Sequence, residues 1–165
     1  MSPRLFGDRR CPPRVGALLV AALALACVQG PPPPALLDTR NEGCGFCRMA
    51  ISDARFASQL VAPAEEPTFF DDLGCLANHL RSAKSAPRGA RVYVADHRTK
   101  AWVRAADAVY TKVPGIETPM GSHVMAHADP ASRDADPDAR AGEPLTPAGL
   151  YGSPLPAPVA REERP

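Results

Sequence analysis

Two cysteines and a methionine lie close together in the stretch GCGFCRM, residues 43–49. Cys44 and Cys47 form a C-x-x-C pair, and Met49 follows two positions after the second cysteine. Three sulfur atoms at this spacing fit a redox disulfide, part of a zinc site, or a site for a softer metal. The neighbouring residues decide between these chemistries.

The third sulfur favours the softer metal. A thioredoxin-like disulfide has its first cysteine at a helix N-terminus, whereas this pair leads into a strand-like segment. A structural zinc site takes four nitrogen or sulfur ligands, and no second C-x-x-C pair follows. Thiolate and thioether together select Cu(I). On an extended strand Cys47 and Met49 project to the same face, so the spacing favours a copper site.

A second source of sulfur lies in TPMGSHVMAH, residues 118–127. Met120 falls in a predicted turn closed by Gly121, where a long apolar side chain has no packing role. We therefore expect Met120 to be a second thioether ligand. His123 or His127 can complete a three-coordinate Cu(I) site, although surface positions are the usual place for such histidines. Met125 is expected in the core.

The stretch FFDDLGCL gives two further candidates. Cys75 falls inside a predicted helix, and we expect a small buried thiol there rather than a ligand. Asp71 and Asp72 are expected to cap the start of that helix and not to act as catalytic acids. The sequence contains no pattern of a nucleophile with a base and an orienting group, so it predicts a protein that is not an enzyme.

The elements that must position these residues are short. A helix begins after Asp71 or Asp72, buries Leu73, Leu76 and Leu80 at helical spacing, and ends near Lys84. Strands are expected in the ranges 47–52, 57–62, 67–70 and 91–97. The range 100–110 is expected to hold another strand plus a short turn or helix, and a last strand follows a turn in 118–128. The order predicts an α+β domain, with one main helix on one face of a small, mostly antiparallel sheet built from ββαβ-type units.

The N-terminal residues have the pattern of an export signal. Four arginines precede an uncharged apolar run over residues 15–26, so residues 1–26 are expected to be a signal peptide. The sequence LALAC resembles a bacterial lipobox, which predicts lipidation at Cys27 and attachment to a membrane. Residues 27–40 are then the lipid anchor and a proline-rich tether. The folded domain is expected over 41–128, and residues 129–165, rich in Pro, Ala and charge, are expected to be disordered.

Removing the signal changes the charge and cysteine totals. It takes away four of 19 basic and one of 18 acidic residues, so 15 basic and 17 acidic residues remain and the net charge is −2. This balance excludes a basic patch for nucleic acid. With Cys27 lipidated, three of the five cysteines are left: Cys44, Cys47 and Cys75. An odd number in an oxidising compartment leaves one thiol over unless a metal holds it.

These motifs resemble the NosL family, the nitrous oxide reductase accessory proteins, over roughly residues 41–128. The stretches that carry the resemblance are CGFCRMAISDARFASQLV, TFFDDLGCL, VYVADH, AWVRAADAVY and TPMG. The resemblance implies a periplasmic, often lipid-anchored Cu(I) chaperone with ββαβ units. It implies Cys47, Met49 and Met120 as copper ligands, with Cys44 present in a subset of members. His127 departs from the family pattern by replacing an aromatic residue, and His123 by replacing a small one.

The expected function is a Cu(I) metallochaperone on the periplasmic face of the bacterial cell envelope. It would deliver copper to a cuproenzyme, with the nitrous oxide reductase assembly system as the expected partner. One alternative is a thiol–disulfide oxidoreductase that uses Cys44 and Cys47. Another is a structural lipoprotein without a metal or stabilised by zinc.

Overall fold

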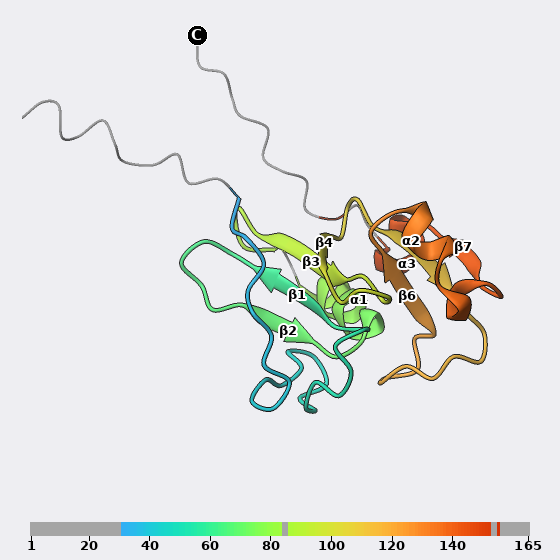
Figure 1. Cartoon of the computed structure of the whole chain (residues 1–165). Helices are drawn as coiled ribbons and strands as arrows, with labels where there is room; N and C mark the ends of the chain where they lie inside the picture. Colours follow the sequence, from blue (N-terminus) through green and yellow to red (C-terminus); the bar gives the residue numbers. More distant parts are fainter. Residues whose placement is uncertain (1–30, 84–85, 153–154, 156–165) are drawn as a thin grey trace, which may run out of the picture. The chain divides into compact units, whose positions relative to one another are not determined.

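The structure, a computed structural model, describes residues 31–83, 86–152 and 155 (Figure 1). These residues form two antiparallel sheets, and the main helix, α1, lies between β2 and β3 in the chain. In chain order the elements are β1 (Ser58–Val61), β2 (Thr68–Phe70), α1 (Leu73–Ser82), β3 (Arg91–Ala95), β4 (Trp102–Arg104), β5 (Val109–Lys112), β6 (Val124–His127), α2 (Pro130–Asp134), the 3-10 helix η2 (Pro137–Ala139), β7 (Glu143–Leu145) and α3 (Pro147–Tyr151).

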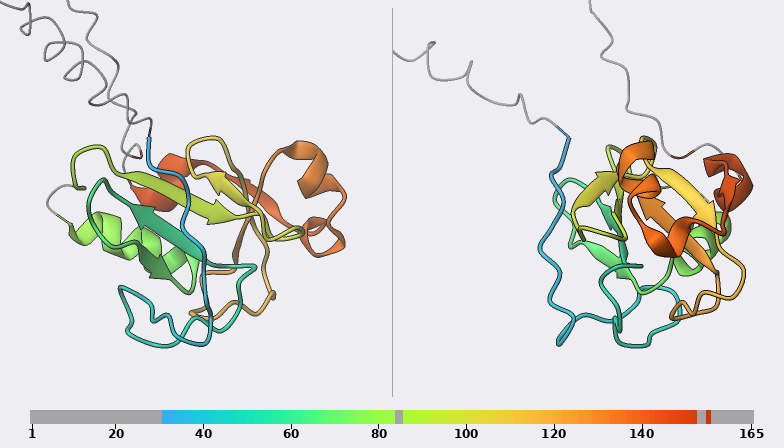
Figure 2. Two further views of the ribbon diagram at one scale, coloured as in Figure 1. Left: turned by 60° about the vertical axis from the view of Figure 1, so that its left-hand side comes forward. Right: turned by 45° about the vertical axis from the view of Figure 1, so that its right-hand side comes forward.

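The first sheet has the strand order β2-β1-β3-β4, and all its pairs are antiparallel. Ser58 lies opposite Phe70 on one side and Val94 on the other, so these three side chains share a face. Helix α1 covers that face (Figure 2). The ring centroids of Phe70 in β2 and His79 in α1 are 4.9 Å apart. The prediction of an α+β domain with its main helix on one face of an antiparallel sheet is confirmed.

The start of the described chain lies on the opposite face of this sheet. The amide of Ala35 donates to Gln59 Oε1 at 2.8 Å, and Gln59 Nε2 donates back to the Ala35 carbonyl at 3.2 Å. The hydroxyl of Tyr93 donates to the carbonyl of Pro32 at 2.7 Å. Part of the predicted tether over 27–40 is thus fixed to the domain, immediately before the C-x-x-C pair.

Helix α1 begins where the sequence predicts. Asp72 is the N-cap, and its carboxylate accepts a hydrogen bond from the amide of Gly74 at 2.6 Å. Leu73 and Leu76 are buried, and Leu80 packs against the same core from a partly buried position. The helix ends at Ser82, two residues before the predicted end.

The second sheet has the order β6-β5-β7 and brings the C-terminal segment into the fold. The core is continuous across both sheets and α1, because Val94, Tyr110 and Leu76 belong to one buried cluster. Leu150 and Tyr151 of α3 are part of it, and the Tyr151 hydroxyl donates to that of Tyr110 at 2.9 Å.

The prediction of disorder over 129–165 is therefore wrong for residues 129–152. Composition misled because the prolines do not interrupt this segment. Three of them are the first residues of short helices, at a position where the missing N–H has no intrahelical partner. Each of these helices has a side-chain cap, from Asp129, Asp136 and Thr146. Residues 156–165 lie outside the described part of the chain, as do the predicted signal peptide and Cys27.

One strand prediction needs correction: residues 47–52 form no strand and make only the isolated bridge between Gly43 and Ala50. The range 100–110 contains the predicted strand, β4, and the predicted turn, and it also includes the start of β5, a separate strand of the second sheet. Across 31–83 and 86–152, none of the helices has the length and apolar character needed to span a bilayer.

Replacing Leu150 by Ala tests the packing of the C-terminal segment. Because Leu150 is buried in the common core, we expect Leu150→Ala to lower the free energy of unfolding by about 2–4 kcal/mol. Leu36 is 95% exposed, so Leu36→Ala should change it by less than about 0.5 kcal/mol. Urea denaturation measures both. Equal, small effects would mean that α3 does not pack on the domain.

Candidate metal centre

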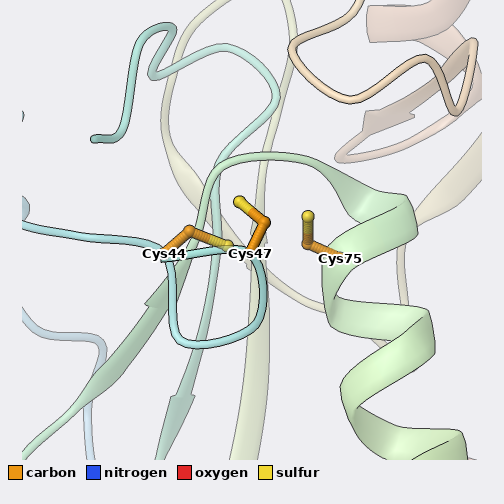
Figure 3. A group of neighbouring side chains, drawn as sticks. All are labelled: Cys44, Cys47 and Cys75. Carbon is orange, nitrogen blue, oxygen red and sulfur yellow. The ribbon is translucent and has the colours of Figure 1, made fainter. Parts of the chain in front are cut away.

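Three cysteines converge at one end of α1. The sulfur atoms of Cys44, Cys47 and Cys75 all lie within 4.8 Å of one another, and none is in a disulfide (Figure 3). Cys44 and Cys75 are buried, whereas Cys47 is partly exposed. Two of the thiols come from the loop 43–50, and the third comes from the first turn of α1.

The loop 43–50 is a tight reversal of the chain. The amide of Cys44 donates to the Met49 carbonyl at 2.7 Å, and the amide of Arg48 donates to the Cys44 carbonyl at 3.0 Å. Arg48 has φ 68°, in the left-handed region. The geometry corrects the expectation that Cys47 and Met49 lie at alternate positions of one strand face. Cys47 lies inside the turn, and Met49 lies beyond the reversal.

A glycine lets this loop contact the first sheet closely. The amide of Gly45 donates to the carbonyl of Phe69 in β2 at 2.7 Å. A Cβ atom at Gly45 would collide with the side chain of Thr68, so only glycine fits this position without a shift. The contact holds Cys44 beside β2, where the chain continues into the helix that carries Cys75.

The two buried thiols are in opposite electrostatic environments. Burial raises the pKa of the Cys44 thiol, but hydrogen bonds to its sulfur from the backbone amides of Asp71, Cys47 and Phe46 outweigh it, so that pKa is lowered. Burial raises the pKa of Cys75, and the neighbouring Cys44 and Cys47 raise it further. The surroundings therefore make the Cys44 thiol easier to ionise than an ordinary cysteine and the Cys75 thiol harder to ionise. A cation among the sulfurs offsets both the burial and the neighbouring sulfurs that raise the pKa of Cys75.

Cys75 is the site residue that sequence reasoning missed. The expected burial is confirmed, but the thiol also faces the C-x-x-C pair. One feature of the sequence could have indicated this role. A cysteine three residues after an N-cap lies in the first helical turn, next to any segment that packs on the helix start. That the loop 43–50 packs there is a tertiary fact that spacing does not show.

The loop 118–122 is tied to the same helix start. The second carboxylate oxygen of Asp72 accepts hydrogen bonds from the Thr118 hydroxyl at 2.7 Å and from the Met120 amide at 3.0 Å. Met120 is 45% exposed, and Met49, whose carbonyl holds Cys44, is 58% exposed. Both thioethers are thus carried by segments bonded to the elements of the cysteine cluster, and both reach solvent.

The two candidate histidines have different surroundings. His123 has φ 58°, and its Nδ1 lies 2.6 Å from the Ile116 carbonyl, so this nitrogen is occupied by a backbone contact. His127 is fully buried in β6, not at the surface as expected. Its ring contacts Asp136, which also binds His97, and neither histidine belongs to the cysteine cluster.

The donor set limits the chemistry of the cysteine cluster. Within the described part of the chain, no fourth His, Cys, Asp or Glu atom joins the three sulfurs. A closed structural zinc site needs four ligands, whereas two or three soft sulfurs satisfy Cu(I). The three thiols can therefore hold a soft metal ion. Cys44 and Cys47 are also near enough for thiol–disulfide chemistry after a local rearrangement.

Comparison with known proteins adds a family match. A family model described as NosL matches residues 36–143, more than half of the chain. The match includes all three clustered cysteines and both candidate thioethers, and it extends past residue 128 through α2 and η2. No curated protein and no solved structure is significantly similar to the chain.

The pH dependence of stability tests the role of Asp72. Burial raises the pKa of this carboxyl, but hydrogen bonds from Ser122, Thr118 and the amides of Gly74 and Met120 lower it below the ordinary value of an aspartate. A carboxyl with a lowered pKa stabilises the fold above its unfolded-state pKa and loses this contribution as pH falls through the folded-state value. Asp72→Asn should therefore cost about 1.5–3 kcal/mol near neutrality and progressively less in acid.

Urea denaturation between about pH 7 and pH 3 measures this difference. Asp107→Asn is the control, because Asp107 is half exposed and bonded only to Arg104; it should change the unfolding free energy by less than about 0.5 kcal/mol. A cost of Asp72→Asn that stays the same at all pH values would contradict the assignment.

Proposed function

This chain belongs to the NosL family, and we propose that it binds one Cu(I) ion at Cys44, Cys47 and Cys75 and passes it to a cuproenzyme during assembly. NosL proteins are copper-binding accessory proteins and not known enzymes. The observation that supports the proposal most is the set of three sulfurs within 4.8 Å with no fourth ligand of the kinds that zinc prefers, in the described residues.

The three thiols divide the work of binding and release. Backbone amides lower the pKa of the Cys44 thiol, so it is the more easily ionised of the two buried thiols and the more available donor for an arriving Cu(I). Cys75 gives up its proton when the ion binds, because the charge of the metal offsets the burial and the neighbouring sulfurs that raise the pKa of this thiol. Cys47 is partly exposed and forms the open side of the site. A three-coordinate ion can be attacked there by a sulfur ligand of the recipient.

Met49 and Met120 extend the site towards solvent. Both side chains are about half exposed, and a neutral thioether binds Cu(I) more weakly than a thiolate does. We propose that they take part in the arrival and departure of the ion, when one of the thiolates is released. In this arrangement the copper ligands of the resemblance, Cys47, Met49 and Met120, act together with the buried pair Cys44 and Cys75.

The family and the N-terminal sequence support a proposal for the recipient and one for the location. We propose nitrous oxide reductase, or its assembly machinery, as the recipient. We also propose that Cys27, outside the described residues, is lipidated and attaches the protein to the periplasmic face of the cell envelope. The segment 31–38 fixed on the sheet would then connect the anchor to the loop 43–50 through a short, ordered part of the chain.

A thiol–disulfide oxidoreductase is the second candidate. The lowered pKa of Cys44 and its closeness to Cys47 favour it. The burial of Cys44 counts against it, because an attacking thiolate must reach the disulfide of another protein. The C-x-x-C pair also lies in a turn, and the helix N-terminus beside it carries Cys75 instead.

Titration with Cu(I) against a competing chelator tests the copper site. We expect one ion per chain, and Zn(II) should not displace it under reducing conditions. Changes beside a metal ligand cost about 10–100-fold in affinity, so loss of a thiolate in Cys44→Ser, Cys47→Ser or Cys75→Ser should cost more than about 100-fold. Met49→Leu and Met120→Leu should weaken binding less.

Met125→Leu is the matched control, because Met125 is fully buried in a separate apolar cluster and should leave copper affinity unchanged. Unchanged affinity in Cys75→Ser would remove the helix thiol from the site. The oxidoreductase would be correct under two conditions. Cu(I) would have to bind neither the native chain nor any variant, and Cys44→Ser and Cys47→Ser would have to abolish disulfide exchange.

Fractionation of bacterial cells tests the anchor. Because Cys27 ends an apolar run with the lipobox-like sequence LALAC, we expect the native chain in the membrane fraction and Cys27→Ser in the soluble periplasmic fraction. The control is Cys11→Ser, which changes a cysteine inside the predicted signal. This variant should appear in the membrane fraction like the native chain. A native chain found entirely in the soluble fraction would disprove lipidation.

A further inference from the structure

A second cluster of possible ligands lies away from the cysteines, at the C-terminal segment. His97 follows β3, His127 ends β6, and Asp136 lies between α2 and η2. Their ligand atoms all lie within 4.8 Å of one another, and none of the three residues is more than 3% exposed. Three elements far apart in sequence thus bring two imidazoles and a carboxylate to one buried point.

The contacts of the cluster converge on a single oxygen. His97 Nδ1 lies 2.7 Å and His127 Nε2 lies 3.0 Å from the same Asp136 Oδ2. The other carboxylate oxygen accepts the Asp138 amide at 3.0 Å and so orients the group. The His97 amide donates to the Ala126 carbonyl at 2.8 Å, which fixes its ring beside β6.

We infer that His97, His127 and Asp136 form a second metal site, for a divalent ion such as Zn(II), distinct from the three thiols. Two imidazole nitrogens and one carboxylate oxygen are the donor set of three-ligand zinc sites, and they suit Cu(II) and Co(II) as well, whereas the hard carboxylate is a poor donor for Cu(I). Bonds of about 2.0–2.2 Å place ligand atoms around a tetrahedral ion about 3.3 Å apart. The two histidine–carboxylate distances, 2.7 and 3.0 Å, therefore need to lengthen by only a few tenths of an ångström.

The outer nitrogens set the strength of this site. His97 Nε2 and His127 Nδ1 are buried and have no hydrogen-bond partner. With protons on the inner nitrogens, the outer atoms expose only lone pairs. When an ion binds the inner nitrogens, each proton moves to the outer nitrogen. In metal-ligating histidines this outer N–H usually donates a hydrogen bond to a carboxylate or carbonyl. Because that support is missing, we expect weaker binding than at a closed structural zinc site, and an ion that exchanges.

Binding at this point joins both sheets to the C-terminal segment. His97 follows a strand of the first sheet, His127 ends a strand of the second, and Asp136 belongs to the segment that also carries η2. A bound ion therefore stabilises the packing of residues 129–139 on the domain. The site uses no sulfur, so it is independent of the proposed copper function.

The test uses Co(II) and a full chain with Cys44, Cys47 and Cys75 replaced by Ser. We expect one equivalent of Co(II), with the visible bands of a nitrogen and oxygen site and without sulfur-to-metal charge transfer. Adding His127→Gln or Asp136→Asn should remove these bands. His79→Gln is the matched control, since His79 lies on α1 next to Phe70 and should leave them intact.

The chain with its native cysteines provides a second measurement if the serine variant does not fold. Zn(II) should raise the melting temperature of the chain with its copper-binding thiols saturated by Cu(I), and the rise should be absent in His97→Gln and His127→Gln. Failure of Co(II) to bind the folded serine variant, or a Zn(II) effect unaltered by these two substitutions, would show that the cluster is a metal-free polar contact.

Discussion

One buried carboxylate, that of Asp72, joins the parts on which the metal centre depends. One of its oxygens caps α1 through the Gly74 amide, and the other receives the Thr118 hydroxyl and the Met120 amide. The start of α1 and the loop 118–122 are therefore held by the same carboxylate. Cys75, in the first turn of α1, keeps a fixed position relative to that loop. A charge buried in this way is stable only because several donors surround it.

The features that the sequence predicts well are local ones. The helix with its cap and its stripe of Leu73 and Leu76 depends on spacing within a few residues, and the strands β1, β2 and β3 depend on short apolar runs. The sequence predicts a strand where the chain turns at Arg48. Residues with positive φ are usually glycine or asparagine, so an arginine at this position does not indicate a turn. Cys75 was missed as a site residue because its nearness to Cys44, 31 positions earlier, arises only from packing.

The C-terminal segment shows a different limit of composition. Residues 129–152 contain few large apolar side chains, yet they fold because Leu150 and Tyr151 complete a core begun elsewhere. A segment that borrows its core needs little apolar content of its own. The same segment places Asp136 between two histidines. The domain thereby separates two donor sets, one of sulfur at the start of α1 and one of nitrogen and oxygen between the sheets.

The hydrogen bond from Gly45 to Phe69 has a consequence for solubility. Strand β2 is the outermost strand of its sheet, and an outermost strand with free carbonyl groups is a template for pairing with another chain. The cysteine loop occupies the Phe69 carbonyl and covers that edge. The loop that carries Cys44 and Cys47 thus also protects the β2 edge from pairing with another chain. A rearrangement that moved this loop away would expose the edge and favour self-association.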